Sequence, residues 1–150
     1  MKYLVFIIAG LSLLVIIFIF LTNLNSINHR PRVIVNGKYF NAEIAKTESQ
    51  KTVGLAKYNK INDDLMMVFP FANKGNYTFW MKDMKFSIDI IYIADNKIVD
   101  IFKNVPYPKS DYESLLRYTP RSPSDTVLEI NAGLSDKYGF EIGDSIKIEY

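Results

Sequence analysis

Two acidic residues, Asp89 and Glu129, stand inside apolar segments that are typical of β-strands. A carboxylate that is buried without partners is costly, so each must be paired, hydrogen-bonded, placed at a strand end or used for function. A cation and an indole, Lys82 and Trp80, share one face of a third predicted strand. If these four side chains converge, they form a charged cluster with an aromatic wall.

Three interpretations of this cluster are open. In the first, Asp89 and Glu129 are structural carboxylates that accept backbone N–H bonds, and Lys82 neutralises one of them. In the second, the two acids join Trp80 and Lys82 in a binding site for a sugar or another polar ligand. In the third, Asp89 and Glu129 are the acid and base of a hydrolase, which requires a suitable separation of the carboxyl groups. We expect a non-catalytic binding module for a polar ligand or an envelope partner.

The composition excludes several other kinds of site. The chain has no cysteine and one histidine, His29, which excludes a thiolate site, a disulfide scaffold, a zinc site with histidine ligands and a histidine-based triad. No glycine-rich phosphate loop is present. We therefore expect no cofactor and no metal. The methionines are expected to pack in the core rather than bind a soft metal, and this applies to Met66, Met67, Met81 and Met84.

The amino terminus carries a strongly apolar segment. Residues 3–21 contain no charged side chain, and as a helix they would span about 28 Å, close to the thickness of the bilayer hydrocarbon. An uncleaved anchor is favoured over a cleaved signal peptide because the run is long and no small-x-small site follows it. Lys2 favours a cytoplasmic amino terminus, although Arg30 and Arg32 oppose it. The sequence predicts a single-pass membrane protein with an extracytoplasmic domain.

The predicted organisation is an anchor over residues 1–22, a polar linker over residues 23–32 and one domain over residues 33–150. Of the 18 lysine and arginine residues, three precede residue 33, which leaves 15 basic residues against 16 acidic ones and a net charge of −1 in the domain. This balance does not favour nucleic acid as a partner.

The domain is predicted to be mainly β, a small antiparallel β-barrel or rolled sheet with one short helix. Asn36-Gly37 is a strong hairpin signal, and the Thr47–Gln50 capping box predicts a helix over residues 48–57. Within that helix Gly54 indicates close packing. Strands are expected at residues 32–36, 38–45, 65–69 (stopped by Pro70), 77–82, 87–94, 97–102, 126–131 and 145–150, with 87–94 as a central strand.

A long segment rich in proline and tyrosine, residues 103–125, separates two of these strands. Loops of such length in a compact domain are often functional. Tyr107, Tyr112 and Tyr118 either form a partner-binding surface or pack onto the sheet. In the former case the protein is a scaffold that recruits another membrane protein.

Several motifs occur together: Phe79-Trp80-Met81-Lys82, Ile88-Asp89-Ile90-Ile91, Gly54-Leu55, Asn104-Val105-Pro106, Gly143-Asp144 and the segment at residues 127–133 that reads VLEINAG. In this combination the chain resembles the domain-of-unknown-function family 192, a group of small bacterial and archaeal domains. The resemblance covers about residues 33–148 and implies a compact β-rich fold and frequent export. It implies no activity, because that family is uncharacterised. The chain departs from the family pattern at Ala56, Lys57 and Tyr58, where a methionine and a nearby arginine are usual.

Overall fold

The computed structural model describes residues 13–19, 30–114 and 116–150. The chain divides into two compact units, Met1–Arg30 and Pro31–Tyr150. In the first unit, residues 13–19 are helical. Among the described residues, none of the helices has the length and hydropathy of a transmembrane span. The predicted anchor (residues 1–22) and linker (residues 23–32) lie largely outside the described residues.

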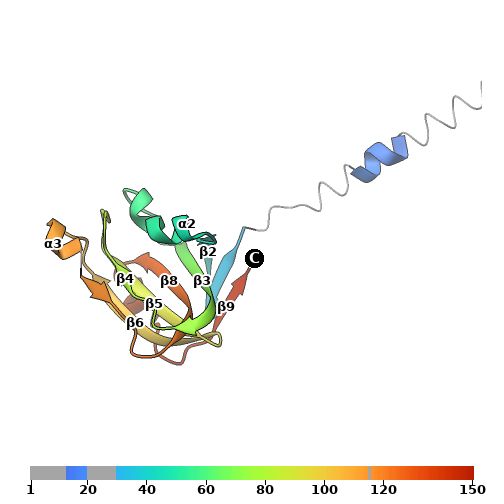
Figure 1. The fold of residues 1–150 in the computed structure, drawn as a ribbon. Helices are drawn as coiled ribbons and strands as arrows, with labels where there is room; N and C mark the ends of the chain where they lie inside the picture. Colours follow the sequence, from blue (N-terminus) through green and yellow to red (C-terminus); the bar gives the residue numbers. More distant parts are fainter. Residues whose placement is uncertain (1–12, 20–29, 115) are drawn as a thin grey trace, which may run out of the picture. The chain divides into compact units, whose positions relative to one another are not determined.

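Seven strands form one curved sheet in the order β6-β5-β8-β3-β2-β1-β9, a half-barrel (Figure 1). Their bounds are β1 (Arg32–Val35), β2 (Lys38–Ile44), β3 (Leu65–Gly75), β5 (Ile88–Ala94), β6 (Lys97–Val105), β8 (Ser124–Asn131) and β9 (Ile146–Glu149). A separate two-stranded sheet joins β4 (Phe79–Trp80) to β7 (Arg117–Tyr118). The short helices of this unit are α2 (Glu48–Val53), the 3-10 helix η1 (Gly54–Lys57), α3 (Asp111–Ser114) and α4 (Leu134–Tyr138).

The prediction of a mainly β domain is confirmed, with two corrections. The sheet is mixed rather than wholly antiparallel, because β2 and β3 run parallel. The connection between them, residues 45–64, contains α2 and η1 and is long enough for the crossover that parallel neighbours need. The described part of the domain also contains several short helices rather than one.

The expected hairpin turn is present, whereas the expected stop at Pro70 is not. Asn36 and Gly37 have φ of 49° and 75°, and they join β1 to β2 as an antiparallel hairpin. Pro70 does not stop its strand, since β3 continues to Gly75. The reason is that the ladder between β3 and β8 is irregular between Pro70 and Gly75, where a residue without an N–H donor is tolerated.

Both faces of the central strands are buried, so the domain has two apolar clusters. Ile91 and Leu128 belong to one cluster, and their neighbours Ile90 and Val127 belong to the other. As predicted, residues 87–94 are central, because β5 pairs with β6 on one side and β8 on the other. The second cluster lies on the face that Glu129 shares with Val127, by the two-residue period of a strand.

The two edge strands of the sheet meet at one end. Lys97 at the start of β6 pairs with Ser145 just before β9. Beside this bridge the Ile98 N–H donates to the Asp144 carbonyl at 2.9 Å, and the Gly143 N–H donates to the Ile98 carbonyl at 2.8 Å. The half-barrel is therefore joined at this end, which satisfies backbone groups that an open edge would expose.

Candidate functional site

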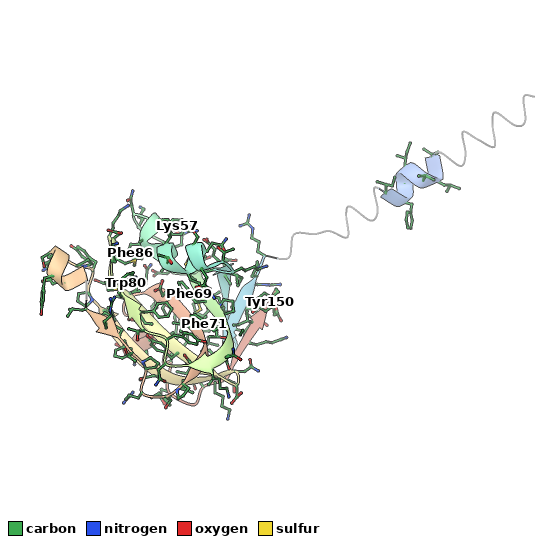
Figure 2. The ribbon with its side chains drawn as sticks, in the orientation of Figure 1. Lys57, Phe69, Phe71, Trp80, Phe86 and Tyr150 are labelled. Atoms are coloured by element: carbon green, nitrogen blue, oxygen red, sulfur yellow. The ribbon has the colours of Figure 1, made fainter. Side chains whose placement is uncertain are left out.

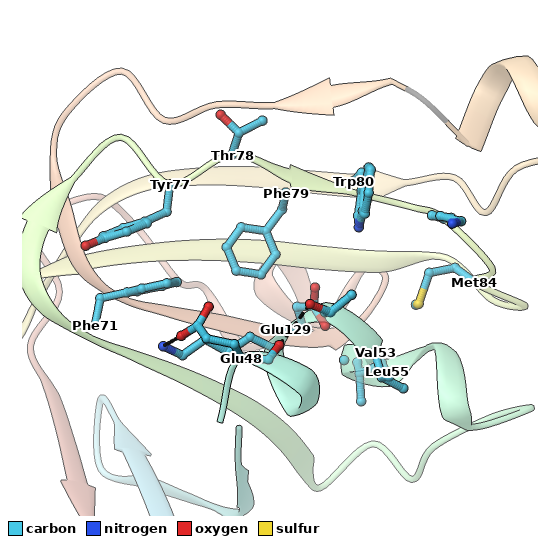
Figure 3. A pocket seen from close by; sticks show the side chains of 14 residues that line it. Glu48, Val53, Leu55, Phe71, Tyr77, Thr78, Phe79, Trp80, Met84 and Glu129 are labelled. Atoms are coloured by element: carbon cyan, nitrogen blue, oxygen red, sulfur yellow. Dashed lines mark hydrogen bonds and ion pairs between the residues drawn. The ribbon is translucent and has the colours of Figure 1, made fainter. Parts of the chain in front are cut away.

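A pocket of about 240 Å³ lies between the α2–η1 segment and β4. Phe69, Phe71 and Trp80 lie on the side of the sheet where α2 is found (Figure 2). Aromatic side chains form one wall, and residues of α2 and η1 form the opposite one (Figure 3). The aromatic lining residues are Phe71, Tyr77, Phe79 and Trp80.

Glu129 from β8 lines this pocket and is 5% exposed. Its neighbours on the adjacent strands are apolar, Met67 on β3 and Ile90 on β5. The Leu55 backbone N–H donates a hydrogen bond to the carboxyl group, whereas Oε2 has no hydrogen-bond partner among the described residues. Burial raises the pKa of Glu129 to about 8, against the weaker opposing effect of the Leu55 bond. The group is therefore largely protonated at neutral pH.

Gly54 brings the backbone close to Glu129. The capping box of Thr47 and Gln50 begins α2, as predicted, and the helix ends at Gly54 with φ of 50° and ψ of −139°, a conformation suited to glycine. A Cβ atom at this position would lie 3.4 Å from Phe69 Cζ and 3.6 Å from Glu129 Oε2. These are ordinary van der Waals distances, so the backbone conformation of Gly54, rather than the close packing that we expected, accounts for the glycine beside the carboxyl group.

Two cationic side chains lie over the ring of Trp80. Arg117 lies opposite it on β7 with Cζ 4.5 Å from the ring centroid, and Lys82 Nζ lies 5.7 Å from that centroid. Lys51, which also lines the pocket, forms an ion pair with Glu48 at 3.0 Å. Lys82 has no ion pair with any residue that the structure describes. The pocket thus combines aromatic faces, a buried carboxyl group and a lysine whose charge is unpaired within the described ranges.

Asp89 lies apart from the pocket. In the register of β5 and β8, Glu129 is opposite Ile90, so Asp89 projects from the other face of the sheet. Asp89 is fully buried, and its carboxylate accepts backbone N–H bonds from Asn104 at 2.7 Å, Gly133 at 3.1 Å and Ser135 at 2.8 Å. These contacts agree with the structural interpretation of this residue.

Comparison with known proteins assigns the domain to a family. The model of DUF192, described as "Uncharacterized ACR", matches residues 32–148. The chain belongs to this family. The resemblance seen in the sequence motifs is therefore confirmed over nearly the whole of the Pro31–Tyr150 unit.

Two solved structures are similar to this DUF192 chain. One is a protein of unknown function from Novosphingobium aromaticivorans DSM 12444, with 29% identity and a TM-score of 0.68 over 77% of this chain and 83% of that one. The other, from Sinorhizobium meliloti 1021, is described as a "putative transcription regulator", also with 29% identity and a TM-score of 0.68, over 79% of this chain and 92% of that one. A comparison with curated proteins found no match.

The three tyrosines predicted as a partner surface have different surroundings in this DUF192 domain. Tyr118 packs against the sheet, with its ring 5.6 Å from that of Phe102 and its carbonyl accepting from the Tyr92 hydroxyl at 2.7 Å. Tyr107 and Tyr112 are exposed. Only these two present their rings to solvent, as a partner-binding surface requires.

Of the four residues predicted to form a ligand site, the DUF192 fold brings three to one pocket: Trp80, Lys82 and Glu129. Sequence reasoning did not assign the wall from α2 and η1 to this site. The capping box and Gly54 were the available signals for it, because a glycine inside a helical pattern indicates a close approach. Within the described residues no cluster of three or more histidine, aspartate or glutamate side chains could hold a metal ion.

Proposed function

We propose that this DUF192 domain is a non-catalytic binding module that takes a small polar ligand into the pocket between α2 and β4. The observation that carries the proposal is Glu129 Oε2, which lines a cavity, is buried and has no hydrogen-bond partner among the described residues. A buried polar atom without a partner costs about 1–3 kcal/mol. A ligand that forms a hydrogen bond at this atom removes that cost on binding.

The chemistry of the lining limits the ligand. A protonated carboxyl group both donates and accepts hydrogen bonds, so Glu129 suits a hydroxyl or amide group. Phe79 and Trp80 offer apolar faces to the rest of the molecule. The cavity of about 240 Å³ is smaller than the roughly 300–1,000 Å³ that drug-sized ligands occupy. A single sugar ring or a molecule of similar size fits these conditions.

The alternatives receive less support. A hydrolase that uses Asp89 and Glu129 needs both carboxyl groups at one substrate, and the two project from opposite faces of the sheet. Regulation of transcription, the description given to the Sinorhizobium protein, is not supported by the net charge of −1 over residues 33–150. A scaffold role rests on Tyr107 and Tyr112, whose exposure suits a partner but does not define one.

The test is thermal unfolding of the full-length chain in mild detergent with a panel of sugars, cell-wall fragments and small amides. A ligand present at about 100 times its dissociation constant stabilises the folded state by roughly 2.7 kcal/mol. We expect at least one compound to raise the midpoint, and Glu129→Leu, which removes the hydrogen-bonding group, to reduce the rise. Glu141→Leu, the same change at an exposed position, is the matched control. The proposal fails if no compound shifts the midpoint, or if the shift is equal in both variants.

We also propose that residues 3–21 hold the domain at a membrane, with the domain outside the cytoplasm. The support is the uncharged apolar run itself. Carbonate extraction of membranes from expressing cells should leave the full chain in the pellet and release a variant that lacks residues 1–22. Protease added to intact spheroplasts should cleave the full chain. Recovery of the full chain in the soluble fraction would contradict the anchor.

A further inference from the structure

A second hollow adjoins the pocket that contains Glu129. It has a volume of about 360 Å³, and it shares Thr52, Val53, Trp80 and Lys82 with the Glu129 pocket. Ala56 lines the second hollow and not the first, so we name it the Ala56 hollow. Because Trp80 and Lys82 border both spaces, a ligand with two linked units can occupy both while contacting the indole between them.

The charges around the two hollows are unequal. Lys51 in the Glu129 pocket is paired with Glu48, and Lys57 in the Ala56 hollow is paired with Glu43. Lys82 borders both hollows and makes no ion pair within the part of the chain that the structure describes. An anionic group at the junction would therefore meet a cation that is not already neutralised. Asp83 also lines the Ala56 hollow, so an anionic group there must lie on the side of Lys82 that is away from the Asp83 carboxylate.

From this geometry we infer that the ligand is an acidic saccharide of at least two units. One sugar ring occupies the Glu129 pocket and hydrogen-bonds to the carboxyl group, and the next lies in the Ala56 hollow, with its carboxylate beside Lys82. The Thr52 hydroxyl donates to the Glu48 carbonyl at 2.8 Å and is free to accept a hydrogen bond from the ligand, and Trp80, which lines both hollows, supplies apolar contact for a sugar ring. The inference rests on the proposed function and specifies its ligand.

The experiment follows Trp80 fluorescence of the full-length chain during titration with defined sugars. The probes are the acidic disaccharides digalacturonate and cellobiouronate, their acidic monomers galacturonate and glucuronate, and neutral cellobiose. We expect an acidic disaccharide to bind at least about tenfold more tightly than its acidic monomer and than cellobiose, a difference of about 1.4 kcal/mol.

Two variants separate the contributions. Ala56→Leu fills the Ala56 hollow and should reduce the affinity for the disaccharide to that of the monomer, with monomer binding unchanged. Lys82→Gln should reduce the affinity for the acidic disaccharide to that of cellobiose, whereas Lys60→Gln, at an exposed position, should not. If Ala56→Leu does not fold, Ala56→Val provides a smaller block.

Equal affinities for monomer and disaccharide in the unmodified chain would overturn the two-unit ligand and leave the Glu129 pocket as the whole site. Absence of binding by both acidic disaccharides, while another compound of the wider panel binds, would overturn the assignment to an acidic saccharide and leave the proposed function standing. Absence of binding by every compound would remove both.

Discussion

The environment of Glu129 differs strongly from that of an ordinary surface acid. Its burial raises the pKa from 4.5 to about 8. Between these two pH values the folded chain holds a proton that the unfolded chain releases, so the free energy of unfolding falls as pH rises. Below about pH 4.5 and above about pH 8 the group has the same charge in both states, and its contribution is constant.

Glu129→Gln removes this titration and keeps the shape of the side chain. We expect the variant and the unmodified chain to have similar stability near pH 4.5, and the variant to be more stable at pH 9, by an amount on the order of a few kcal/mol. Urea unfolding at pH 4.5, 7 and 9 measures the difference, in which the titration of all other groups cancels. A difference that does not change with pH would show that Glu129 is already ionised in the fold.

Asp89 should respond differently, since its carboxylate accepts three backbone N–H bonds. Asp89→Asn leaves one acceptor oxygen and turns an N–H₂ group toward at least one of these donors. We expect the free energy of unfolding to fall by about 2–4 kcal/mol, since hydrogen bonds to charged groups and buried unpaired donors are both costly. Ligand affinity, measured well below the unfolding midpoint, should not change. Lost binding at full stability would instead place Asp89 in the site.

At the scale of elements, the junction between α2 and η1 at Gly54 shapes one wall of the pocket. Gly54→Ala places a side chain in a backbone conformation that costs about 1–3 kcal/mol, and the added methyl group lies 3.6 Å from Glu129 Oε2. We expect lower stability together with weaker ligand binding. Gly139→Ala is the matched control, because Gly139 has φ of 65° but no atom within 4 Å of an added Cβ. It should lower stability with binding intact, and equal loss of binding in both variants would contradict the role of Gly54.

Elements with local signals could be predicted from the sequence. The Asn36-Gly37 turn, the Thr47 capping box and the continuous apolar strand of residues 87–94 are all present as expected. The two-residue period of a strand also accounts for Glu129 facing away from Leu128 and Ile130, which lie in the apolar cluster on the other face of the sheet. Each of these features depends on residues that are close together in the chain.

Features that depend on register between distant strands could not be predicted. The parallel pairing of β2 with β3 follows from the crossover through α2 and η1, which no local motif specifies. The separation of Asp89 from Glu129 depends on which residues of β5 and β8 stand opposite each other. A shift of one residue would have placed the two acids on the same face. Three of the four residues predicted for a ligand site line one pocket, whereas the position of Asp89 depends on this long-range register.

At the scale of the whole molecule, β3 and β5 contribute side chains to both faces of the sheet, and they couple the pocket to the rest of the domain. Phe79, next to Trp80, packs edge-on against Phe69 of β3 and Tyr92 of β5, with ring centroids 5.0 Å and 6.1 Å away. The alternate residues of these strands belong to the apolar cluster on the other face of the sheet, which also includes Ile146 of β9. Loss of packing in that cluster should therefore destabilise the pocket as well.

Ile146→Ala tests this coupling, because Ile146 is 4% exposed and lies beside the point where β9 meets β6. We expect the free energy of unfolding to fall by about 2–5 kcal/mol. Trp80 is the only tryptophan, so its fluorescence follows the pocket while circular dichroism follows the sheet. The two transitions should coincide in the unmodified chain and shift together in the variant, as in a cooperative domain.

Ile142→Ala, at a 58% exposed position, is the control and should change the free energy of unfolding by no more than about 0.5 kcal/mol. A fluorescence transition that precedes the loss of strand signal would mean that the pocket opens independently of the sheet, and ligand binding would then stabilise only that local region.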